Sequence, residues 1–310
     1  MRELAQKLSR ARQVLLVCHQ NPDGDTMGSA LALARGLRTL GKRAQVASEP
    51  PPDVYRAFPG AEELLPPERI QPGFDLAILV DFGEKQRAGC PASLFAGVPL
   101  AIVDHHANGV HESDCVVLDP RAGATAELIF PLLDQLGCAV DPVSANWLYA
   151  ALITDTGSFN FSNTTARTLE MGARAVGAGA DPEFVSRAVF RSKKLSQVRL
   201  LAASLNTLSI DGDFAWVHTD AAMYRETGAS EAETDSIINH VLEIEGVSVA
   251  AIFKVRASDV RISFRSKYEV DVGRIAARFD GGGHRKASGC TIPGSLDEAV
   301  RQVREQLMSR

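Results

Sequence analysis

The sequence predicts an α/β fold with a mostly parallel sheet and flanking helices, followed by a smaller α+β domain. In the first part of the chain, short uninterrupted apolar runs alternate with segments of helical periodicity. Such runs are typical of strands that are buried on both faces of a parallel sheet. With 310 residues, of which 45% are hydrophobic, the chain has enough apolar material for two domains with separate cores.

The strands of the first domain are expected where aliphatic and β-branched residues run together. These runs cover residues 14–19, 44–48, 75–81, 100–106 and 115–119. Helical patterns lie between or after them, at residues 26–40, 124–136, 142–153 and 165–178. Gly41 and Gly137 each follow a helical pattern and are expected to end a helix.

We expect the first domain to cover residues 1–182 and the second to cover residues 206–310, with a helical connector at residues 183–205. The strands of the second domain are longer than those of the first. They are expected at residues 214–219, 248–256 and 260–266, with helices near 230–243, 271–278 and 296–308.

Composition and charge exclude several classes of protein. No apolar run approaches roughly 18 residues, and the first residues are charged where a signal peptide is apolar, so we expect a cytoplasmic protein without membrane association. Five scattered cysteines, never spaced as Cys-x-x-Cys, favour neither disulfides nor structural zinc. A net charge of -5 argues against tight binding to long nucleic acid, including long duplexes, and leaves a short anionic ligand open.

Side chains that bind metals follow four of the predicted elements. They are His19, Asp23 and Asp25 after the first strand, Asp81 after the third, Asp104, His105 and His106 at the end of the fourth, and Asp155 after the helix that begins at residue 142. Because the carboxyl ends of parallel strands share one edge of a sheet, these segments should converge on one crevice.

Several carboxylates crowded together would repel one another unless cations neutralised them. Two divalent ions would do so, held by oxygen and imidazole ligands without thiolate. The expected ligands are His19, Asp23, Asp25, Asp81, His105 and Asp155. This ligand set favours two Mn²⁺ ions, with Mg²⁺ or Co²⁺ as substitutes and zinc as an alternative.

Each piece of this pattern also has a purely structural explanation. Asp-Gly-Asp at 23–25 is often only a turn, and an aspartate after a strand is often only a helix N-cap. The paired histidines could be polar groups satisfied within the fold, and Asp155-Thr-Gly could be a turn that ends its helix. Their joint occurrence, each at the end of a predicted element, favours a metal site.

The second domain carries a candidate anion site. Gly281, Gly282 and Gly283 precede His284 and Lys286, and three glycines let backbone N–H groups approach an anion, although a glycine triplet alone is more often a flexible turn. Arg261, Ser263 and Arg265 alternate along a strand, so they share one face, while Ile262 and Phe264 face the core. Guanidinium groups beside a hydroxyl suit phosphate, and a solvated edge strand is the alternative.

Together these residues resemble the DHH family of phosphoesterases. The resemblance rests on His-x-Asn-Pro-Asp-Gly-Asp at 19–25, on Asp81, on Asp104-His105-His106, on Asp155 and on Gly-Gly-Gly-His at 281–284. The order, the spacing and the length are most similar to short bacterial members, which degrade RNA oligomers of a few nucleotides and dephosphorylate pAp (adenosine 3',5'-bisphosphate).

The resemblance implies a role for each matching residue. It implies one metal held by His19, Asp23 and Asp81, and a second held by Asp25, Asp81, His105 and Asp155, so that Asp81 bridges them. It also implies that Asp104 orients the site, that His106 contacts the scissile phosphate, and that Arg261, Arg265, Gly282, Gly283 and His284 grip the phosphate or bases of the substrate across a cleft. A homodimer through the first domain is a further implication.

The expected reaction is hydrolysis of short RNA to mononucleotides and of pAp to AMP, supported by two metal ions. Three alternatives are a cyclic-dinucleotide or linear-dinucleotide phosphodiesterase, a manganese-dependent pyrophosphatase, and a nucleotide-binding sensor that does not cleave. The sequence does not identify a residue that stacks on the bases, because alternation places Phe264 in the core.

Overall fold

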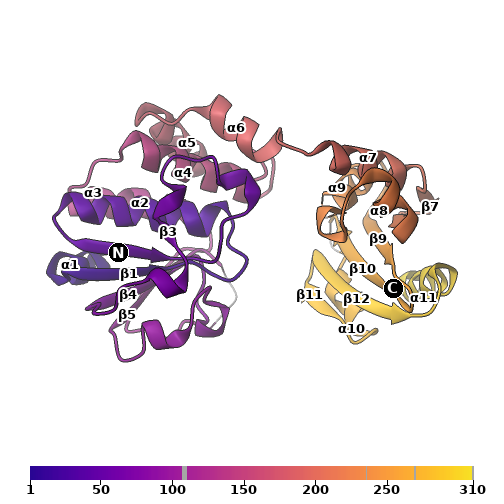
Figure 1. Ribbon diagram of the computed structural model, residues 1–310, viewed down its shortest axis with the longest axis horizontal. Helices are drawn as coiled ribbons and strands as arrows, with labels where there is room; N and C mark the ends of the chain where they lie inside the picture. Colours follow the sequence, from indigo (N-terminus) through magenta and orange to yellow (C-terminus); the bar gives the residue numbers. More distant parts are fainter. Residues whose placement is uncertain (107–109, 235, 269, 309–310) are drawn as a thin grey trace. The chain divides into compact units, whose positions relative to one another are not determined.

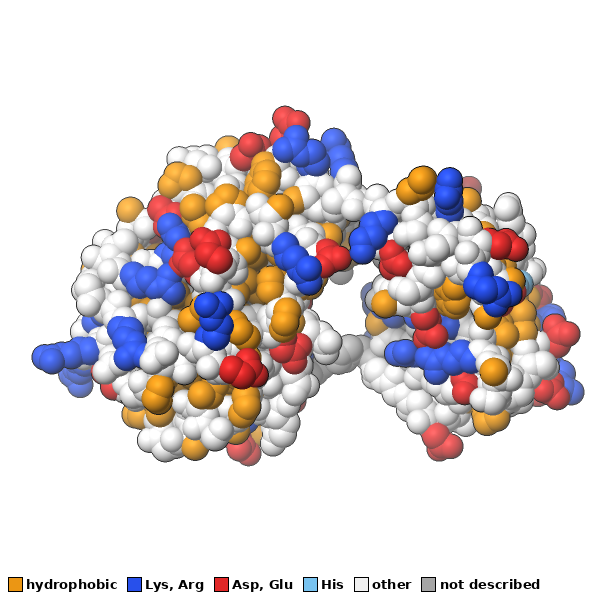
Figure 2. All heavy atoms as spheres, in the orientation of Figure 1, with side chains coloured by type: hydrophobic (Ala, Val, Ile, Leu, Met, Phe, Trp, Pro, Cys, Tyr) orange, Lys and Arg blue, Asp and Glu red, His pale blue; other side chains and the backbone are white. Residues whose placement is uncertain are grey.

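The computed structural model describes residues 1–106, 110–234, 236–268 and 270–308. The chain divides into two compact units, Met1–Ser192 and Lys193–Arg310, which we call unit 1 and unit 2. No helix in these described stretches is both long and apolar enough to cross a membrane. On the face that Figure 2 shows, basic side chains lie intermixed with acidic ones in both units.

Unit 1 is built on a six-stranded sheet of order β3-β2-β1-β4-β5-β6 in which every neighbouring pair is parallel. Its strands are β1 (Gln13–Val17), β2 (Arg43–Ala47), β3 (Leu64–Leu65), β4 (Leu76–Val80), β5 (Leu100–Asp104) and β6 (Cys115–Leu118). The five expected strands are present, and the predicted parallel sheet is confirmed. The central strands β1, β4 and β5 are almost entirely buried, as their unbroken apolar runs require.

The helices of unit 1 are α1 (Arg2–Arg10), α2 (Gly24–Thr39), α3 (Ala126–Leu136), α4 (Pro142–Asp155), α5 (Ala166–Gly177) and α6 (Pro182–Phe190). Apolar side chains from all six join one core with one face of the sheet. The other face packs against the loops and short 3-10 turns that connect β3, β4 and β5. In Figure 1, α2 lies between the sheet and α4, and thirteen of its sixteen residues are buried.

The site is positioned by the order of the strands. From β1, the chain passes to β2 and β3 on one side of the sheet and then to β4, β5 and β6 on the other. The two directions of winding therefore diverge between β1 and β4, and ligands bind outside the carboxyl ends of strands at such a point. His19 follows β1 and Asp81 follows β4, so the fold places both beside this crevice.

Unit 2 contains a mixed sheet of order β11-β12-β10-β9-β8-β7, in which only the pair β8 and β9 is parallel. Its strands are β7 (Ser209–Asp211), β8 (Phe214–Thr219), β9 (Val249–Val255), β10 (Asp259–Ser266), β11 (Gly282–His284) and β12 (Ala287–Pro293). Its helices are α7 (Leu195–Leu205), α8 (Ala221–Thr227), α9 (Ile237–Leu242), α10 (Val272–Ala277) and α11 (Leu296–Met308). The predicted smaller α+β unit is therefore confirmed.

The two faces of the second sheet are covered unequally. Helices α10 and α11 form a core with one face, which includes Ile262 and Phe264. On the other face, α7 and α9 form a second core with β8 and β9, and α9 also contacts β10. Arg261, Ser263 and Arg265 on β10 do not belong to this second core: Arg261 is exposed, and Ser263 and Arg265 are half-buried. Strand β10 lies between β9 and β12 in the sheet. The alternative interpretation of Arg261, Ser263 and Arg265, as residues of a solvated edge strand, is therefore wrong.

The helical connector expected at residues 183–205 is interrupted. Helix α6 ends at Phe190 in unit 1, and α7 begins at Leu195 in unit 2. Residues 190–195 are all exposed, so no buried apolar face holds them in a helix. Helices in water need such packing to persist, and the chain therefore leaves the helical conformation here.

The contact between α2 and α4 depends on Gly28. A Cβ atom at this position would lie 2.4 Å from the backbone oxygen of Trp147 on α4. We expect Gly28→Ala to lower the free energy of unfolding by about 1–3 kcal/mol, because the two helices would have to move apart. Urea unfolding followed by circular dichroism measures this change.

Gly177→Ala is the matched control, since a Cβ atom there would meet no atom within 4 Å. Alanine also favours helix by about 1 kcal/mol over glycine, so this control should be neutral or stabilising. An unchanged unfolding midpoint in Gly28→Ala would contradict the close packing of α2 on α4.

Candidate active site

The carboxyl edge of the first sheet brings together carboxylates and imidazoles from five segments. Three groups of three residues stand out, and within each group the potential ligand atoms lie within 4.8 Å of one another. They are His19 with Asp23 and Asp81, Asp25 with His105 and Asp155, and Asp81 with His105 and His106. All six residues that the sequence suggested as metal ligands belong to these groups, which overlap at Asp81 and His105.

Asp81 lies between the two histidines. Its Oδ2 is 3.6 Å from Nε2 of His19, and its Oδ1 is 3.6 Å from Nε2 of His105. The residue is buried and has a φ of 71°, in the left-handed region that side chains rarely adopt. Such a conformation costs about 1–3 kcal/mol and tends to persist at functional sites. The strained turn after β4 is what directs this carboxylate between the two histidines.

The start of α2 positions two more carboxylates. Asp23 is the N-cap of the helix and accepts hydrogen bonds from the backbone N–H groups of Asp25 and Thr26. Its Oδ1 also lies 3.6 Å from Nε2 of His19, so the capping role and a ligand role are compatible. Asp25 is completely buried and accepts hydrogen bonds from the backbone N–H groups of Thr125 (2.5 Å) and Ala126 (3.0 Å) at the start of α3.

Backbone carbonyls orient the two imidazoles. Nδ1 of His19 lies 2.8 Å from the carbonyl oxygen of Gln20, and Nδ1 of His105 lies 3.0 Å from that of Ala122. If each Nδ1–H donates to its carbonyl, each Nε2 is the atom directed at the carboxylates, as is common for metal-binding histidines. Nε2 of His105 is buried and lies 3.1 Å from Oδ2 of Asp155. Within the described residues, this nitrogen has no partner that meets hydrogen-bond geometry. A divalent cation fits this donor set.

The electrostatics of the cluster also fit a cation. Burial lowers the pKa of His19, but hydrogen bonds with Asp23 and Asp81 outweigh burial and raise that pKa to about 10. The pKa of His105 is likewise raised to about 10, against burial, chiefly by Asp155. Burial raises the pKa of Asp25 well above its usual value, and the negative charge of Asp81 adds to the effect. Protons thus occupy the cluster where metal ions would otherwise balance the charge.

Asp104 is held in place by hydrogen bonds from His106. Its Oδ1 accepts hydrogen bonds from the backbone N–H and from Nδ1 of His106, at 3.0 and 2.8 Å. Burial raises the pKa of Asp104, but the hydrogen bonds from His106 outweigh burial and lower that pKa to about 2. The side chain of His106 is partly exposed, so the buried carboxylate can orient this imidazole toward a ligand.

His111 is a residue of this site that the sequence analysis missed. Its Nε2 lies 3.1 Å from Oδ2 of Asp104, whereas His106 contacts Oδ1 of the same carboxylate. A Cβ atom at Gly83 would lie 2.6 Å from the imidazole of His111, so the glycine makes room for the ring. The only signal in the sequence was a further histidine seven residues after Asp104, which is weak without the fold.

The proposed anion-binding residues lie in unit 2. Arg261, Ser263, Gly281 and Gly282 help to line a pocket of about 680 Å³ on the sheet. Thr291 on β12 also lines it, and the sequence analysis did not suggest this residue. Arg265 lies farther along β10, where its Nη1 donates to the carbonyl oxygen of Phe264.

Gly283 and His284 belong to β11, and Lys286 lies in the turn between β11 and β12. Gly283 has a φ of 137°, and a Cβ atom there would lie 2.6 Å from the carbonyl oxygen of Ala287. This position therefore requires glycine. The side chain of His284 lies outside the described part of the structure.

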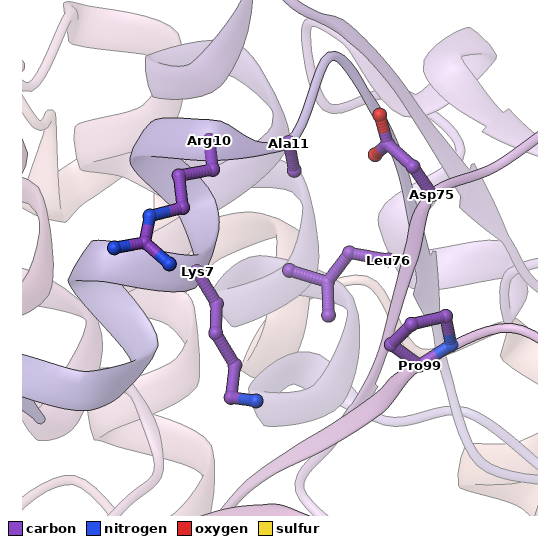
Figure 3. A pocket seen from close by; sticks show the side chains of 6 residues that line it. All are labelled: Lys7, Arg10, Ala11, Asp75, Leu76 and Pro99. Carbon is purple, nitrogen blue, oxygen red and sulfur yellow. The ribbon is translucent and has the colours of Figure 1, made fainter.

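A separate pocket of about 280 Å³ lies at the opposite edge of the first sheet. Figure 3 shows its lining, which consists of Lys7, Arg10, Ala11, Asp75, Leu76 and Pro99. Asp75 directly precedes β4 and accepts hydrogen bonds from the backbone N–H groups of Arg12 and Gln13. None of the candidate metal ligands lines this pocket, so it is separate from the crevice that holds them.

Comparison with known proteins identifies the class. Residues 13–153 match the DHH family, N-terminal domain, and residues 217–309 match the DHHA1 domain. The chain belongs to the DHH family. It is 32% identical over 295 residues to the bifunctional oligoribonuclease and PAP phosphatase NrnA of Thermus thermophilus, covering 94% of this chain and 88% of that protein.

The protein of the same name from Bacillus subtilis is 26% identical over 306 residues, covering 96% of this chain and 95% of that protein. Among solved structures, an exopolyphosphatase-related protein from Bacteroides fragilis aligns with a TM-score of 0.90 at 25% identity. The alignment covers 99% of this chain and 95% of that chain. The resemblance stated from the motifs is therefore confirmed.

The raised pKa values predict how metal binding depends on pH. His19 and His105 must each lose a proton to bind a cation through Nε2, because protonated imidazole has no free lone pair. Between pH 6.5 and 8.5 we expect the affinity for Mn²⁺ to rise with pH, and protons to be released on binding. Calorimetric titration in buffers of different ionisation enthalpy counts these protons.

His240→Asn, a change on α9 in unit 2, is the control and should release the same number of protons as the wild type. His105→Gln should release fewer. A heat of binding that does not depend on the buffer would contradict the protonated state of the metal-free cluster.

Proposed function

We propose that this protein is a phosphoesterase that hydrolyses short RNA oligonucleotides to mononucleotides and dephosphorylates pAp to AMP, with two divalent metal ions. The observation that carries the proposal is the position of Asp81, whose two oxygens each lie 3.6 Å from a different histidine. One buried carboxylate facing two ligand groups is the arrangement that a two-metal centre requires. The two NrnA relatives support the choice of substrates.

His19, Asp23 and Asp81 would hold one metal, and Asp25, Asp81, His105 and Asp155 would hold the other. We propose Mn²⁺ as the preferred ion, with Mg²⁺ or Co²⁺ as substitutes, because the ligands are carboxylates and imidazoles without thiolate. When bound, such ions supply an activated water and stabilise negative charge on phosphate oxygens.

The chain itself would bind and orient the phosphate. His106 donates through Nδ1 to Asp104, which leaves its Nε2 for the scissile phosphate. The hydrogen bond to Asp104 raises the pKa of His106, so the imidazole carries a positive charge more readily beside an anionic substrate. Asp104 is held in turn by His111 and would act as a positioning residue.

Unit 2 would bind the rest of the substrate. We propose that Arg261, Arg265, Gly282, Gly283, His284 and Lys286 contact its terminal phosphate or its bases. The support is the pocket that Arg261 and Gly282 help to line, together with the exposed side chain of Arg261. Arg261 lies 3.6 Å from Glu231, so an incoming phosphate would compete with this carboxylate for the guanidinium group.

A homodimer through unit 1 is part of the proposal. Strand β6 is at the edge of the sheet, and its Val116 and Leu118 are exposed to 38% and 39%. Exposed apolar residues on an edge strand favour pairing with another chain.

The experiment that tests this function compares substrates side by side. Purified protein with Mn²⁺ is offered pAp, a ribodinucleotide, a longer RNA and cyclic di-AMP, and product formation is measured for each. We expect turnover of pAp and the dinucleotide to exceed that of the longer RNA and the cyclic dinucleotide. Preferred cleavage of cyclic di-AMP would favour a cyclic-dinucleotide phosphodiesterase, and tight binding of pAp without cleavage would favour a sensor.

Asp81→Ala should abolish hydrolysis of pAp, because it removes the carboxylate shared by both ligand groups. Asp104→Ala is the comparison, and its loss should be smaller, about 10–100-fold, as is usual for a residue that orients a ligand without binding the metal. Rates of phosphate release at saturating Mn²⁺ measure both effects. Near wild-type turnover in folded Asp81→Ala would contradict the proposal that Asp81 bridges the two metal ions.

Arg265→Ala and His284→Ala should raise KM for short phosphorylated substrates and leave Mn²⁺ binding unchanged, because neither residue is among the proposed metal ligands. Calorimetry for Mn²⁺ and steady-state kinetics for pAp separate the two effects. Arg304→Ala, at an exposed ion pair with Asp211, is a control for the loss of one positive charge from unit 2. Loss of metal from either binding variant would instead assign unit 2 to the metal site.

A further inference from the structure

The loop that follows Asp155 has an unusual backbone. Gly157, Ser158 and Phe159 have consecutive positive φ values of 54°, 58° and 64°. Two of these residues carry side chains, which disfavour this conformation, so the surrounding contacts must hold the loop in place. Strain of this kind is retained where a segment has to present a side chain in a fixed position.

The loop is tied to the candidate metal ligand. The side-chain amide of Asn163 donates to the backbone carbonyl oxygens of Asp155 (3.1 Å) and Gly123 (3.0 Å). The backbone N–H of Phe161 donates to the carbonyl oxygen of Thr156 at 3.0 Å, which closes the loop on itself. These hydrogen bonds therefore connect the loop to the end of α4 at Asp155.

Two phenylalanines in this loop have opposite environments. Phe159 packs on the core, with its ring centroid 6.3 Å from that of Tyr149. Phe161 is 60% exposed. Its ring lies over Gly157, where an added Cβ atom would be only 2.5 Å away. Gly157 thus supports one side of the ring and a large part of the ring surface remains open to solvent.

We propose that Phe161 stacks on a nucleobase of the substrate and is a specificity-determining residue of this site. The inference rests on the proposed function, because it assigns a role to Phe161 only if nucleotides are bound at the crevice. An exposed aromatic ring, held rigidly on a loop anchored to Asp155, suits a base whose phosphate is bound at the metal cluster. Every base presents a π face, so such a platform accepts RNA ends of any sequence and disfavours phosphates that lack a base.

The test compares ligands with and without a base. For Phe161→Ala we expect KM for pAp to rise by roughly 5- to 150-fold, which is the fold-change that corresponds to the usual cost of removing one stacking ring. kcat and Mn²⁺ binding should stay near wild type, and Phe161→Trp should restore KM. Leu169→Ala, an exposed apolar side chain on α5, is the matched control and should leave KM unchanged.

Calorimetric binding of AMP and of ribose 5-phosphate in the presence of Mn²⁺ gives a readout that does not depend on turnover. We expect wild type to bind AMP more tightly than ribose 5-phosphate, and Phe161→Ala to lose that difference. An unchanged preference for AMP in Phe161→Ala would overturn the inference, as would a variant that changes only the oligomeric state. Failure of wild type to hydrolyse pAp would count against the proposed function, whereas the AMP comparison would still decide the role of Phe161.

Discussion

Four carboxylates and two imidazoles crowd at the carboxyl edge of the first sheet, and the rest of the structure is arranged around this crowding. Asp25 and Asp81 are buried, so water cannot screen their charges. The neighbouring carboxylates favour positive charge on the imidazoles and, against burial, raise the pKa of both His19 and His105 to about 10. Burying such groups is costly unless they are paired or bind metal, so the cluster is explained by function and not by stability.

Hydrogen bonds with the backbone stabilise these crowded side chains. The N–H groups at the start of α3 bind Asp25, those at the start of α2 bind Asp23, and carbonyl groups bind Nδ1 of the two histidines. Fixed dipoles therefore surround the ligands before any cation arrives. The close approach of α2 to α4 at Gly28 brings Asp25 and Asp155, at opposite ends of these helices, to the same edge.

Much of this arrangement could be predicted from the sequence because its signals are local. Continuous apolar runs identified the buried parallel strands. Ligand-type residues followed three of these strands, so the topology of a parallel sheet implied that the ligands would meet. The break in the expected helix at residues 183–205 could not be predicted, because helical periodicity did not reveal that residues 190–195 are exposed. Strand β12 was missed because Ala, Ser, Gly and Cys at its start carry little strand preference. His111 and Phe161 were missed because their roles depend on the cavity at Gly83 and on the turn at Gly157, which only the folded backbone defines.

The number of metal ions bound tests the account most directly. Protein freed of metal and dialysed against Mn²⁺ can be analysed for metal content, with Asp25→Asn and Asp81→Ala treated in parallel. We expect two Mn²⁺ per chain in wild type, one in Asp25→Asn because the ligands around His19 remain, and fewer than one in Asp81→Ala. A wild-type protein that is folded and binds no Mn²⁺ would contradict this expectation, as would two retained ions in Asp81→Ala.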